Sequence, residues 1–463
     1  MKKRIFIIVA VVLVAGIATA GVLGALWYRE QTEEKVVRGS STEEFVTTDA
    51  PEAEAPRPKK EVRRIPWPMY GYNAARTKFA PEFKHRPPFK RLWDVQTHKY
   101  IEYPPAVAEG RVFVANQEGD FLAIRGKDGK VLWHKELGRC VVSGPAFKNG
   151  TVYVGVMNPL PCQRASSRST QSGYVLAVDA KTGKQRWRFN TTPVESSPLI
   201  VGNFLYVGSW NHRIYALSTR NGRVRWSFDA GAEVNSSGAF ADGTVFFGTD
   251  NGYVYALNAW NGSVKWRAAA FSRFGSREYF YAAPAVAYGR VYIGNSDGTL
   301  YAFGAKSGNL LWAQSAGTYV YASPAIWDKK IYLGTYDGRF TAFDAATGDV
   351  VWRREMPSAI HGAATVLNGL VYFSTLSSNI APRAKRYVKR GQRGSYALDA
   401  RTGKLVWDWP GMGMYSPVVA DEQRIYLVGS TRVVGLQPRN APEQRDRDKK
   451  KSKKQRSAGS GGS

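Results

Sequence analysis

The chain has 463 residues, a formal net charge of +28 and an aromatic content of 13%. Charged residues at 22% and hydrophobic residues at 44% are ordinary for a folded protein, which excludes wholesale disorder. The presence of only two cysteines excludes a disulfide-dense small domain and a cysteine-rich zinc or iron–sulfur module.

The N-terminal end predicts a membrane anchor. Residues 5–28 form an uncharged, mostly apolar run of 24 residues behind the basic segment 1–4. At about 1.5 Å per residue, a helix of this length crosses a bilayer core of about 30 Å. The basic end is expected to stay in the cytoplasm, which places the rest of the chain on the extracytoplasmic side. Because Ala18-Thr19-Ala20 resembles a signal-peptidase site, secretion after cleavage is the alternative.

Two further segments lack the apolar residues that a packed core needs. Residues 29–65 are rich in Glu, Thr, Pro and Lys, and they are predicted to form a disordered stalk. Residues 439–463 carry a Lys/Arg cluster followed by Gly and Ser, and they are predicted to form a disordered basic tail. The tail either contacts an anionic polymer or lipid surface or only raises solubility, and its Gly/Ser end is either native or a cloning remnant.

A repeated unit organises the predicted domain, residues 66–438. Three copies share the pattern Ala-x-Asp-Ala-x-Thr-Gly-x-x-x-Trp, at residues 177–187, 342–352 and 397–407. Each unit predicts four short strands separated by turns, the last of which is the Trp strand. Four-stranded units of about 40–45 residues are typical of β-propeller blades. The sequence therefore predicts an all-β propeller with docking tryptophans at Trp93, Trp133, Trp187, Trp226, Trp266, Trp312, Trp352 and Trp407.

The number of blades follows from counting strands. The sequence has eight Trp strands and eight sets of three other strands. The first Trp strand, near residues 89–95, has no three-strand set before it. The last set, which ends near residues 433–436, has no Trp strand after it. The two incomplete parts are expected to form one blade, in which the N-terminal strand is the outer strand that closes an eight-bladed ring.

The repeat resembles the tryptophan-docking motif of the pyrroloquinoline-quinone (PQQ)-like propeller superfamily, over roughly residues 93–437. The resemblance implies one of two activities, because a fold hosts many functions. Quinoprotein dehydrogenases of the superfamily bind PQQ and calcium, whereas BamB-like propellers are non-enzymatic scaffolds that bind proteins. BamB-like lipoproteins are anchored through a lipidated cysteine, which this chain lacks near its N-terminus, so an uncleaved helix would replace that anchor.

Candidate ligands for the enzymatic alternative lie where the first strand of each blade begins. Glu195 and Asn235 occupy equivalent positions in neighbouring blades and are suitable ligands for a hard cation. Tyrosines follow at the next two such positions, where a further carboxylate would be expected, and no adjacent cysteine pair is present. The sequence therefore predicts no cofactor and no catalytic residue, with PQQ and calcium as the alternative. The channel-mouth candidates are Glu102, Glu195, Asn235, Tyr281, Tyr321 and His361.

Three insertions are expected to decorate one face of the ring. They span residues 157–172, 268–280 and 376–393, in connections that leave a blade on the same side. They hold ten basic residues against one acid, Glu278, which favours an anionic partner. The predicted binding residues are Arg164, Arg168, Arg273, Arg277, Tyr279, Arg383, Lys385, Arg386, Tyr387, Lys389, Arg390 and Arg393.

The two cysteines, Cys140 and Cys162, are expected on this face, either as a disulfide that fixes the first insertion or as free thiols. The sequence as a whole predicts a single-pass protein of the cytoplasmic membrane with a monomeric propeller outside. Its partner is expected to be an acidic protein, an anionic cell-surface polymer or lipid, and not nucleic acid. The alternative function is a PQQ-dependent alcohol or sugar oxidoreductase that uses the same face.

Overall fold

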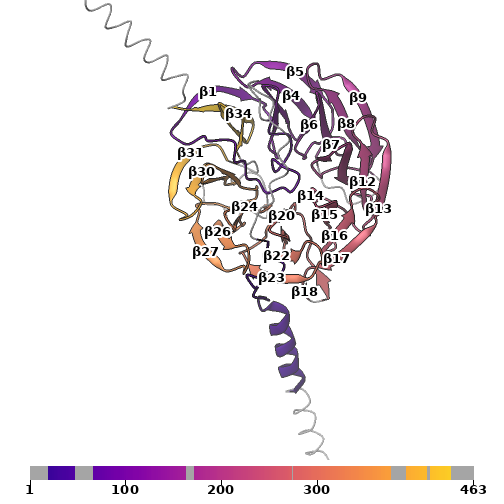
Figure 1. Ribbon diagram of the computed structural model, residues 1–463, viewed down its shortest axis with the longest axis vertical. Helices are drawn as coiled ribbons and strands as arrows, with labels where there is room; N and C mark the ends of the chain where they lie inside the picture. The colour runs from indigo at the N-terminus through magenta and orange to yellow at the C-terminus, as the bar shows by residue number, and fades with distance from the viewer. Residues whose placement is uncertain are drawn as a thin grey trace, which may run out of the picture.

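The computed structural model describes residues 19–46, 66–162, 171–273, 275–376, 393–413 and 418–439. Eight antiparallel sheets of four strands each surround a central axis, which confirms the predicted eight-bladed propeller (Figure 1). In seven of the blades the four strands follow one another in the chain. A two-stranded hairpin, β18 (Ser272–Arg273) and β19 (Ser276–Arg277), lies in the connection between the fourth and fifth blades.

The seven blades with consecutive strands are numbered in chain order. Blades 1 to 3 are β2 (Ala106–Ala108), β3 (Arg111–Ala115), β4 (Asp120–Arg125) and β5 (Val131–Glu136); β6 (Ala146–Lys148), β7 (Thr151–Val156), β8 (Gly173–Asp179) and β9 (Gln185–Thr191); and β10 (Leu199–Val201), β11 (Phe204–Gly208), β12 (Arg213–Ser218) and β13 (Val224–Asp229). Blades 4 and 5 are β14 (Ala239–Ala241), β15 (Thr244–Gly248), β16 (Tyr253–Asn258) and β17 (Val264–Ala269); and β20 (Ala285–Ala287), β21 (Arg290–Gly294), β22 (Thr299–Gly304) and β23 (Leu310–Ser315). Blades 6 and 7 are β24 (Ala325–Trp327), β25 (Lys330–Gly334), β26 (Arg339–Asp344) and β27 (Val350–Glu355); and β28 (Thr365–Leu367), β29 (Leu370–Ser374), β30 (Gly394–Asp399) and β31 (Leu405–Pro410).

Blade 8 joins the two ends of the domain. It contains β32 (Val419–Ala420), β33 (Ile425–Gly429), β34 (Arg432–Pro438) and, as its outer strand, β1 (Phe89–Gln96). β1 pairs with β34 from Phe89↔Pro438 to Gln96↔Arg432. The closure predicted from the two incomplete units is therefore confirmed, and it leaves the ring without an open end.

Within the described part of the chain, seven of the eight docking tryptophans, all except Trp407, donate an indole hydrogen bond to a carbonyl of the next blade. The Trp187 indole of blade 2 donates a hydrogen bond to the Thr219 carbonyl of blade 3, at 3.0 Å, and lies against Gly222. Gly222 has a φ of +70°, and a Cβ atom there would lie 2.6 Å from the indole ring. A glycine is thus required for both reasons. The repeated glycine serves the tryptophan of the preceding blade, although the sequence pattern pairs it with the tryptophan of its own unit.

Residues 66–85, called here the plug segment, cross the channel. Because the first strand of every blade lines the axis, its inner edge is open to pairing. The plug segment accepts backbone hydrogen bonds from inner strands of five blades, namely Phe147 to Pro68, Phe240 to Ala74, Val286 to Ala75, Ile326 to Thr77 and Val366 to Lys78. It also pairs with blade 1 through Trp67 and Val107. The inner edges are therefore covered by the chain itself.

A second segment, residues 36–46, packs on the outside of blades 5 and 6 and is called here the tether. Val37 pairs with Ala313 beside the outer strand of blade 5, and Phe45 lies 5.3 Å from the Tyr288 ring. Arg290 is fully buried and donates hydrogen bonds to the carbonyls of Ser40 and Glu43. This part of the predicted stalk is therefore packed against the propeller, because backbone pairing and one arginine replace the missing apolar contacts. Residues 47–65 lie outside the described residues.

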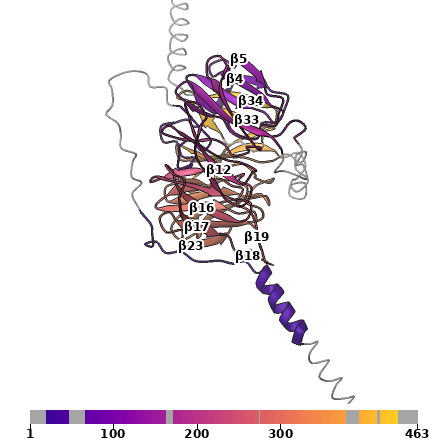
Figure 2. The same cartoon turned by 90° about the vertical axis from the view of Figure 1, so that its right-hand side faces the viewer.

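Before the tether, residues 19–32 form a helix that points away from the ring (Figures 1 and 2). Its apolar side chains are exposed, among them Leu26 and Trp27. None of the helices in the described part of the chain is long and apolar enough to cross a membrane, so the predicted transmembrane helix over 5–28 is not supported. The predicted basic end, residues 1–4, and residues 5–18 of the predicted helix lie outside the described residues. Residues 440–463 of the predicted tail lie outside them as well.

Replacing Arg290 with methionine is expected to release the tether. The carbonyls of Ser40 and Glu43 would lose their donor, and each unsatisfied group costs about 1–3 kcal/mol. Trypsin cleavage after Lys35 or Arg38 should then become at least about tenfold faster under conditions in which cleavage follows local opening. Lys306→Met, at an exposed neighbouring position, is the control. Equal cleavage rates in Arg290→Met and the wild type would contradict this role of Arg290.

Candidate functional site

The predicted channel-mouth residues meet at a cavity on the propeller axis. Glu102, Tyr281, Tyr321 and His361 line it. They precede the inner strands of blades 1, 5, 6 and 7, as the equivalence of the repeats predicted. Four further polar side chains that the sequence analysis missed also line the cavity, namely Tyr70, Tyr103, Ser237 and Ser323. Tyr103 directly follows a predicted position, whereas Tyr70 comes from the plug segment, which has no repeat.

Glu195 and Asn235 do not line this cavity, and their oxygens already accept hydrogen bonds. Glu195 is buried and accepts one from the Tyr281 hydroxyl at 2.5 Å. The Asn235 amide oxygen accepts one from the Trp210 indole at 2.6 Å, and its nitrogen donates to Asp250 at 2.7 Å. The two side chains are therefore engaged with donors of the protein.

The upper wall of the cavity is aromatic. The Tyr321 ring stacks on His361 at 5.2 Å between centroids and meets Tyr281 edge-on at 5.5 Å. Tyr336 lies 5.1 Å from Tyr321 and hydrogen bonds with His361. Burial raises the pKa of Tyr281 well above its usual value, and the charge of Glu195 adds to this effect. Tyr281 is consequently a neutral phenol that donates to Glu195.

Tyr70 of the plug segment also lines the cavity, and two buried basic side chains pack near its ring. The Tyr70 hydroxyl donates to Ser323 at 2.8 Å. The Arg76 guanidinium and the Lys78 ammonium lie 5.4 Å and 5.3 Å from the Tyr70 ring centroid. Both side chains are almost fully buried. Burial lowers the pKa of Arg76 to about 10, and burial together with the Arg76 charge lowers the pKa of Lys78 well below its usual value.

These cations are satisfied by main-chain oxygens. Arg76 donates to Gly238 at 2.9 Å, to Pro198 at 3.2 Å and to Ser197 at 3.3 Å, so it connects the plug segment to blades 3 and 4. It also hydrogen bonds to the Tyr70 carbonyl. Lys78 donates to the Pro324 carbonyl of blade 6 at 3.0 Å. The channel is thus closed beneath the cavity by the chain itself.

The residues at this site do not fit PQQ with calcium. The space open to the centre of a water molecule is about 30 Å³, enough for one or two waters and far too small for a fused-ring cofactor. The candidate cation ligands Glu195 and Asn235 accept from a phenol and an indole instead. Elsewhere in the described part, Asp120, His134 and Glu136 are close enough to share a metal ion, but they lie on the outer half of blade 1.

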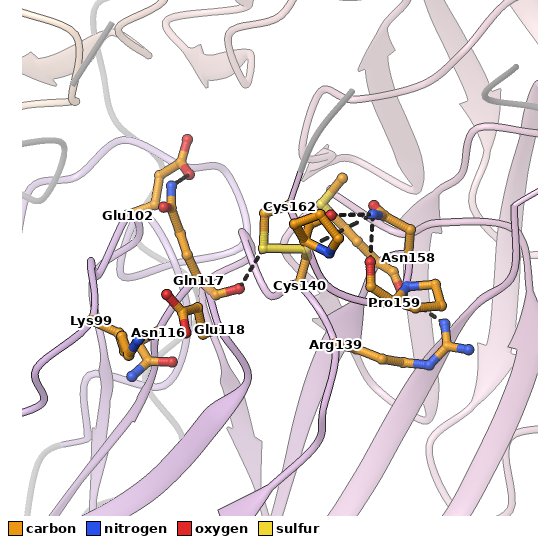
Figure 3. The surroundings of a disulfide bond; sticks show 12 residues. Lys99, Glu102, Asn116, Gln117, Glu118, Arg139, Cys140, Asn158, Pro159 and Cys162 are labelled. Carbon is orange, nitrogen blue, oxygen red and sulfur yellow. Dashed lines mark hydrogen bonds and ion pairs between the residues drawn. A yellow bond between two sulfur atoms is a disulfide. The ribbon is translucent and has the colours of Figure 1, made fainter. Parts of the chain in front are cut away.

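A disulfide between Cys140 and Cys162 connects the first insertion to the mouth (Figure 3). Their Cα atoms are 5.4 Å apart, and backbone hydrogen bonds between Cys140 and both Met157 and Asn158 hold the same junction. Gln117 lies between the disulfide and the cavity. Its carbonyl oxygen is 2.9 Å from Cys162 Sγ, and its side chain donates to Glu102 at 2.7 Å.

The three insertions lie in the predicted connections, β7–β8, β17–β20 and β29–β30. Within them, Arg277 is exposed and lies 5.2 Å over the Tyr253 ring, and Arg393 is exposed at the start of β30. The Tyr279 and Tyr321 hydroxyls hydrogen bond at 2.5 Å, which links the second insertion to the cavity wall. Arg273 belongs to β18. The remaining predicted binding residues, Arg164, Arg168, Arg383, Lys385, Arg386, Tyr387, Lys389 and Arg390, lie outside the described residues.

A family model and several curated proteins match this chain, among them BamB and alcohol dehydrogenases of the quinone type. A family model described as outer membrane protein assembly factor BamB matches residues 90–227, 162–295, 211–323 and 297–460. Outer membrane protein assembly factor BamB of Moranella endobia is 26% identical over 150 residues, which cover 31% of this chain and 38% of that protein. The dehydrogenase subunit of a quinone alcohol dehydrogenase from Komagataeibacter europaeus is 28% identical over 197 residues, which cover 35% of this chain and 25% of the subunit.

The chain is similar in structure both to a BamB and to an alcohol dehydrogenase. BamB from Moraxella catarrhalis superposes with a TM-score of 0.59 at 16% identity, covering 76% of this chain and 100% of that one. The quinohemoprotein alcohol dehydrogenase from Comamonas testosteroni gives a TM-score of 0.63 at 14% identity, covering 81% of this chain and 80% of that one. At these identities the likeness shows the fold alone.

Proposed function

Because the chain belongs to the family whose model is described as outer membrane protein assembly factor BamB, we propose that it is a binding scaffold. The observation that carries this proposal is the filled channel, in which Arg76 and Lys78 lie beneath a cavity of water size. A propeller whose axis is occupied by its own chain offers loops and a shallow mouth to a partner, and no room for a large cofactor.

We place the binding surface on the face that carries the insertions and the cavity. Arg277 and Arg393 are exposed there, and the sequence of the β29–β30 connection has five more basic residues between 377 and 392. A surface of this charge attracts an acidic protein partner and speeds its association. An anionic cell-surface polymer or lipid is the alternative ligand and an outcome of the test below.

We also propose that the propeller lies outside the cytoplasm and is attached to the membrane by its N-terminal segment. The basic residues before the apolar run 5–28 support this orientation. The Cys140–Cys162 disulfide supports an oxidising compartment, since such bonds are rare in the cytosol. The tether would then hold the ring by blades 5 and 6.

Changing the five basic residues of 377–392, Arg383, Lys385, Arg386, Lys389 and Arg390, to glutamine tests the binding surface. Leu376 is kept because it is buried and its carbonyl accepts a hydrogen bond from Ser358. The full chain is purified from crosslinked membranes, and the acidic proteins recovered with it are quantified. Their recovery with the glutamine variant should be at least about tenfold lower than with the wild type, and recovery with the wild type should fall as the salt concentration rises.

A variant with Lys449, Lys450, Lys451, Lys453 and Lys454 changed to glutamine is the matched control, since it removes the same five positive charges from the tail. Equal recovery from the loop variant and the wild type would contradict the proposal. If only anionic vesicles bind, and binding is lost in the loop variant, the partner is a lipid surface and the claim of an acidic protein partner falls.

A second candidate function, a quinone-dependent oxidoreductase, is favoured by one observation. Several of the matching proteins are alcohol dehydrogenases of the quinone type, and the fold is the same. The cavity and the engaged Glu195 and Asn235 argue against it, and a cofactor-binding measurement separates the two.

A further inference from the structure

The cavity at the channel mouth has the walls of a site for a small cation. The rings of Tyr281, Tyr321 and His361 surround it, and Tyr103 completes the lining on the side of blade 1. Aromatic rings carry negative charge on their faces and attract ammonium groups within about 6 Å of the ring centroid. Neighbouring rings in this wall are 5.2 Å and 5.5 Å apart, so a group placed among them would contact more than one.

The charge of the lining favours a cation as well. Among the residues that line the cavity, Glu102 is the charged one, and no Lys or Arg belongs to the described lining. Glu195 accepts a hydrogen bond from the Tyr281 hydroxyl at 2.5 Å, which orients the phenol. The nearest basic side chains, Arg76 and Lys78, lie 5.4 Å and 5.3 Å from the Tyr70 ring centroid and direct their donors to main-chain carbonyls.

The size of the cavity selects among cations. Its volume of about 30 Å³ holds one or two water-sized groups. A primary ammonium group at the end of a narrow methylene chain matches that size, whereas a quaternary ammonium or a planar guanidinium is larger. The opening is formed by Glu102, Tyr321 and His361, which are all partly exposed. A side chain can therefore reach the cavity from the decorated face.

We infer that the channel mouth is a socket for one lysine side chain of a protein partner, whose ammonium pairs with Glu102 and contacts the Tyr281 and Tyr321 rings. This inference rests on the proposed scaffold function and adds a central anchor to the basic surface around it. A buried anchor inside a rim of weaker contacts is the usual arrangement of protein interfaces. The partner surface would be acidic, with one lysine at the point that faces the axis.

n-Butylammonium, which reproduces the end of a lysine side chain, is the probe. Saturation-transfer NMR with the full chain at constant ionic strength should show saturable binding, with n-butanol and butyrate binding at least tenfold more weakly. Glu102→Gln and Tyr321→Leu should each weaken butylammonium binding at least tenfold. Glu118→Gln should leave it unchanged, because Glu118 is near Glu102 in Figure 3 but pairs with Lys99 at 2.7 Å.

Each variant is first checked for an unchanged melting temperature, so that loss of binding is separated from loss of fold. Binding of n-butanol as strong as that of butylammonium, or undiminished binding by Glu102→Gln, would overturn the inference. These measurements use no protein partner. Failure of the socket would leave the loop-dependent recovery of partners intact, and failure of the scaffold proposal would leave butylammonium binding intact.

Discussion

Arg76→Met is expected to lower the free energy of unfolding by about 3–5 kcal/mol, because three buried carbonyls lose a charged donor and each buried group left unsatisfied costs about 1–3 kcal/mol. The guanidinium holds the plug segment to the carbonyls of Ser197, Pro198 and Gly238, in two blades. Methionine fills a similar volume but donates no hydrogen bond, so these buried carbonyls would be left without that donor.

Chemical unfolding followed by tryptophan fluorescence measures this loss. Arg86→Met is the matched control, because Arg86 directly follows the plug segment and its side chain is exposed. The free energy of unfolding of this variant should change by no more than about 0.5 kcal/mol. Arg76→Lys should fall between the two, since an ammonium cannot reproduce the planar fork of donors. A loss below about 1 kcal/mol for Arg76→Met would show that the plug segment is not held by this residue.

Trp312→Ala is expected to cost about 3–5 kcal/mol, the usual range for deleting a large buried aromatic side chain. Trp312 is the docking tryptophan that the tether covers. It has no exposed surface, and a Cβ atom on Gly39 of the tether would lie 2.6 Å from its ring. Its indole also donates to the Ala345 carbonyl of blade 6 at 3.2 Å. The substitution removes one contact between blades and one contact with the tether.

Trp352→Ala is the comparison, because Trp352 occupies the same position in the next blade, donates to Ala400 at 3.1 Å and is partly exposed. Unfolding of both variants, together with trypsin cleavage of the tether, separates the two contributions. We expect the larger loss, and faster cleavage after Arg38, only in Trp312→Ala. Equal losses and equal cleavage would show that the tether adds nothing at this position.

The ring could be predicted from the sequence because its interactions are local and repeated. Seven of the blades are runs of neighbouring strands, and seven docking tryptophans meet a turn one unit away, so a period of about 40 residues carries both facts. The closing strand followed from counting incomplete units. The plug segment and the tether could not be predicted in this way. The plug segment pairs with main-chain groups spread over most of the ring, the tether is held at blades 5 and 6, and neither segment has a periodic pattern.

The candidate site was predicted in part for the same reason. Equivalent repeat positions placed Glu102, Tyr281, Tyr321 and His361 together at the mouth. Repeat position does not tell which way a side chain turns, however, so the sequence could not show that Glu195 and Asn235, ligands only in the alternative interpretation, accept hydrogen bonds from Tyr281 and Trp210. Trp210, which bonds to Asn235, and Arg76, which closes the channel, lie outside the repeated positions that the sequence analysis compared.

The proposed binding scaffold has a channel that is filled by the chain itself. The most direct test of this proposal is equilibrium dialysis of the full chain against PQQ and Ca²⁺. Absorbance of the retained cofactor is recorded, followed by dye-linked oxidation of ethanol and glucose. Because the cavity has the size of one or two waters, we expect no retained chromophore and no dye reduction. One PQQ bound per chain, with dye reduction that requires alcohol or sugar, would contradict the scaffold and establish the oxidoreductase.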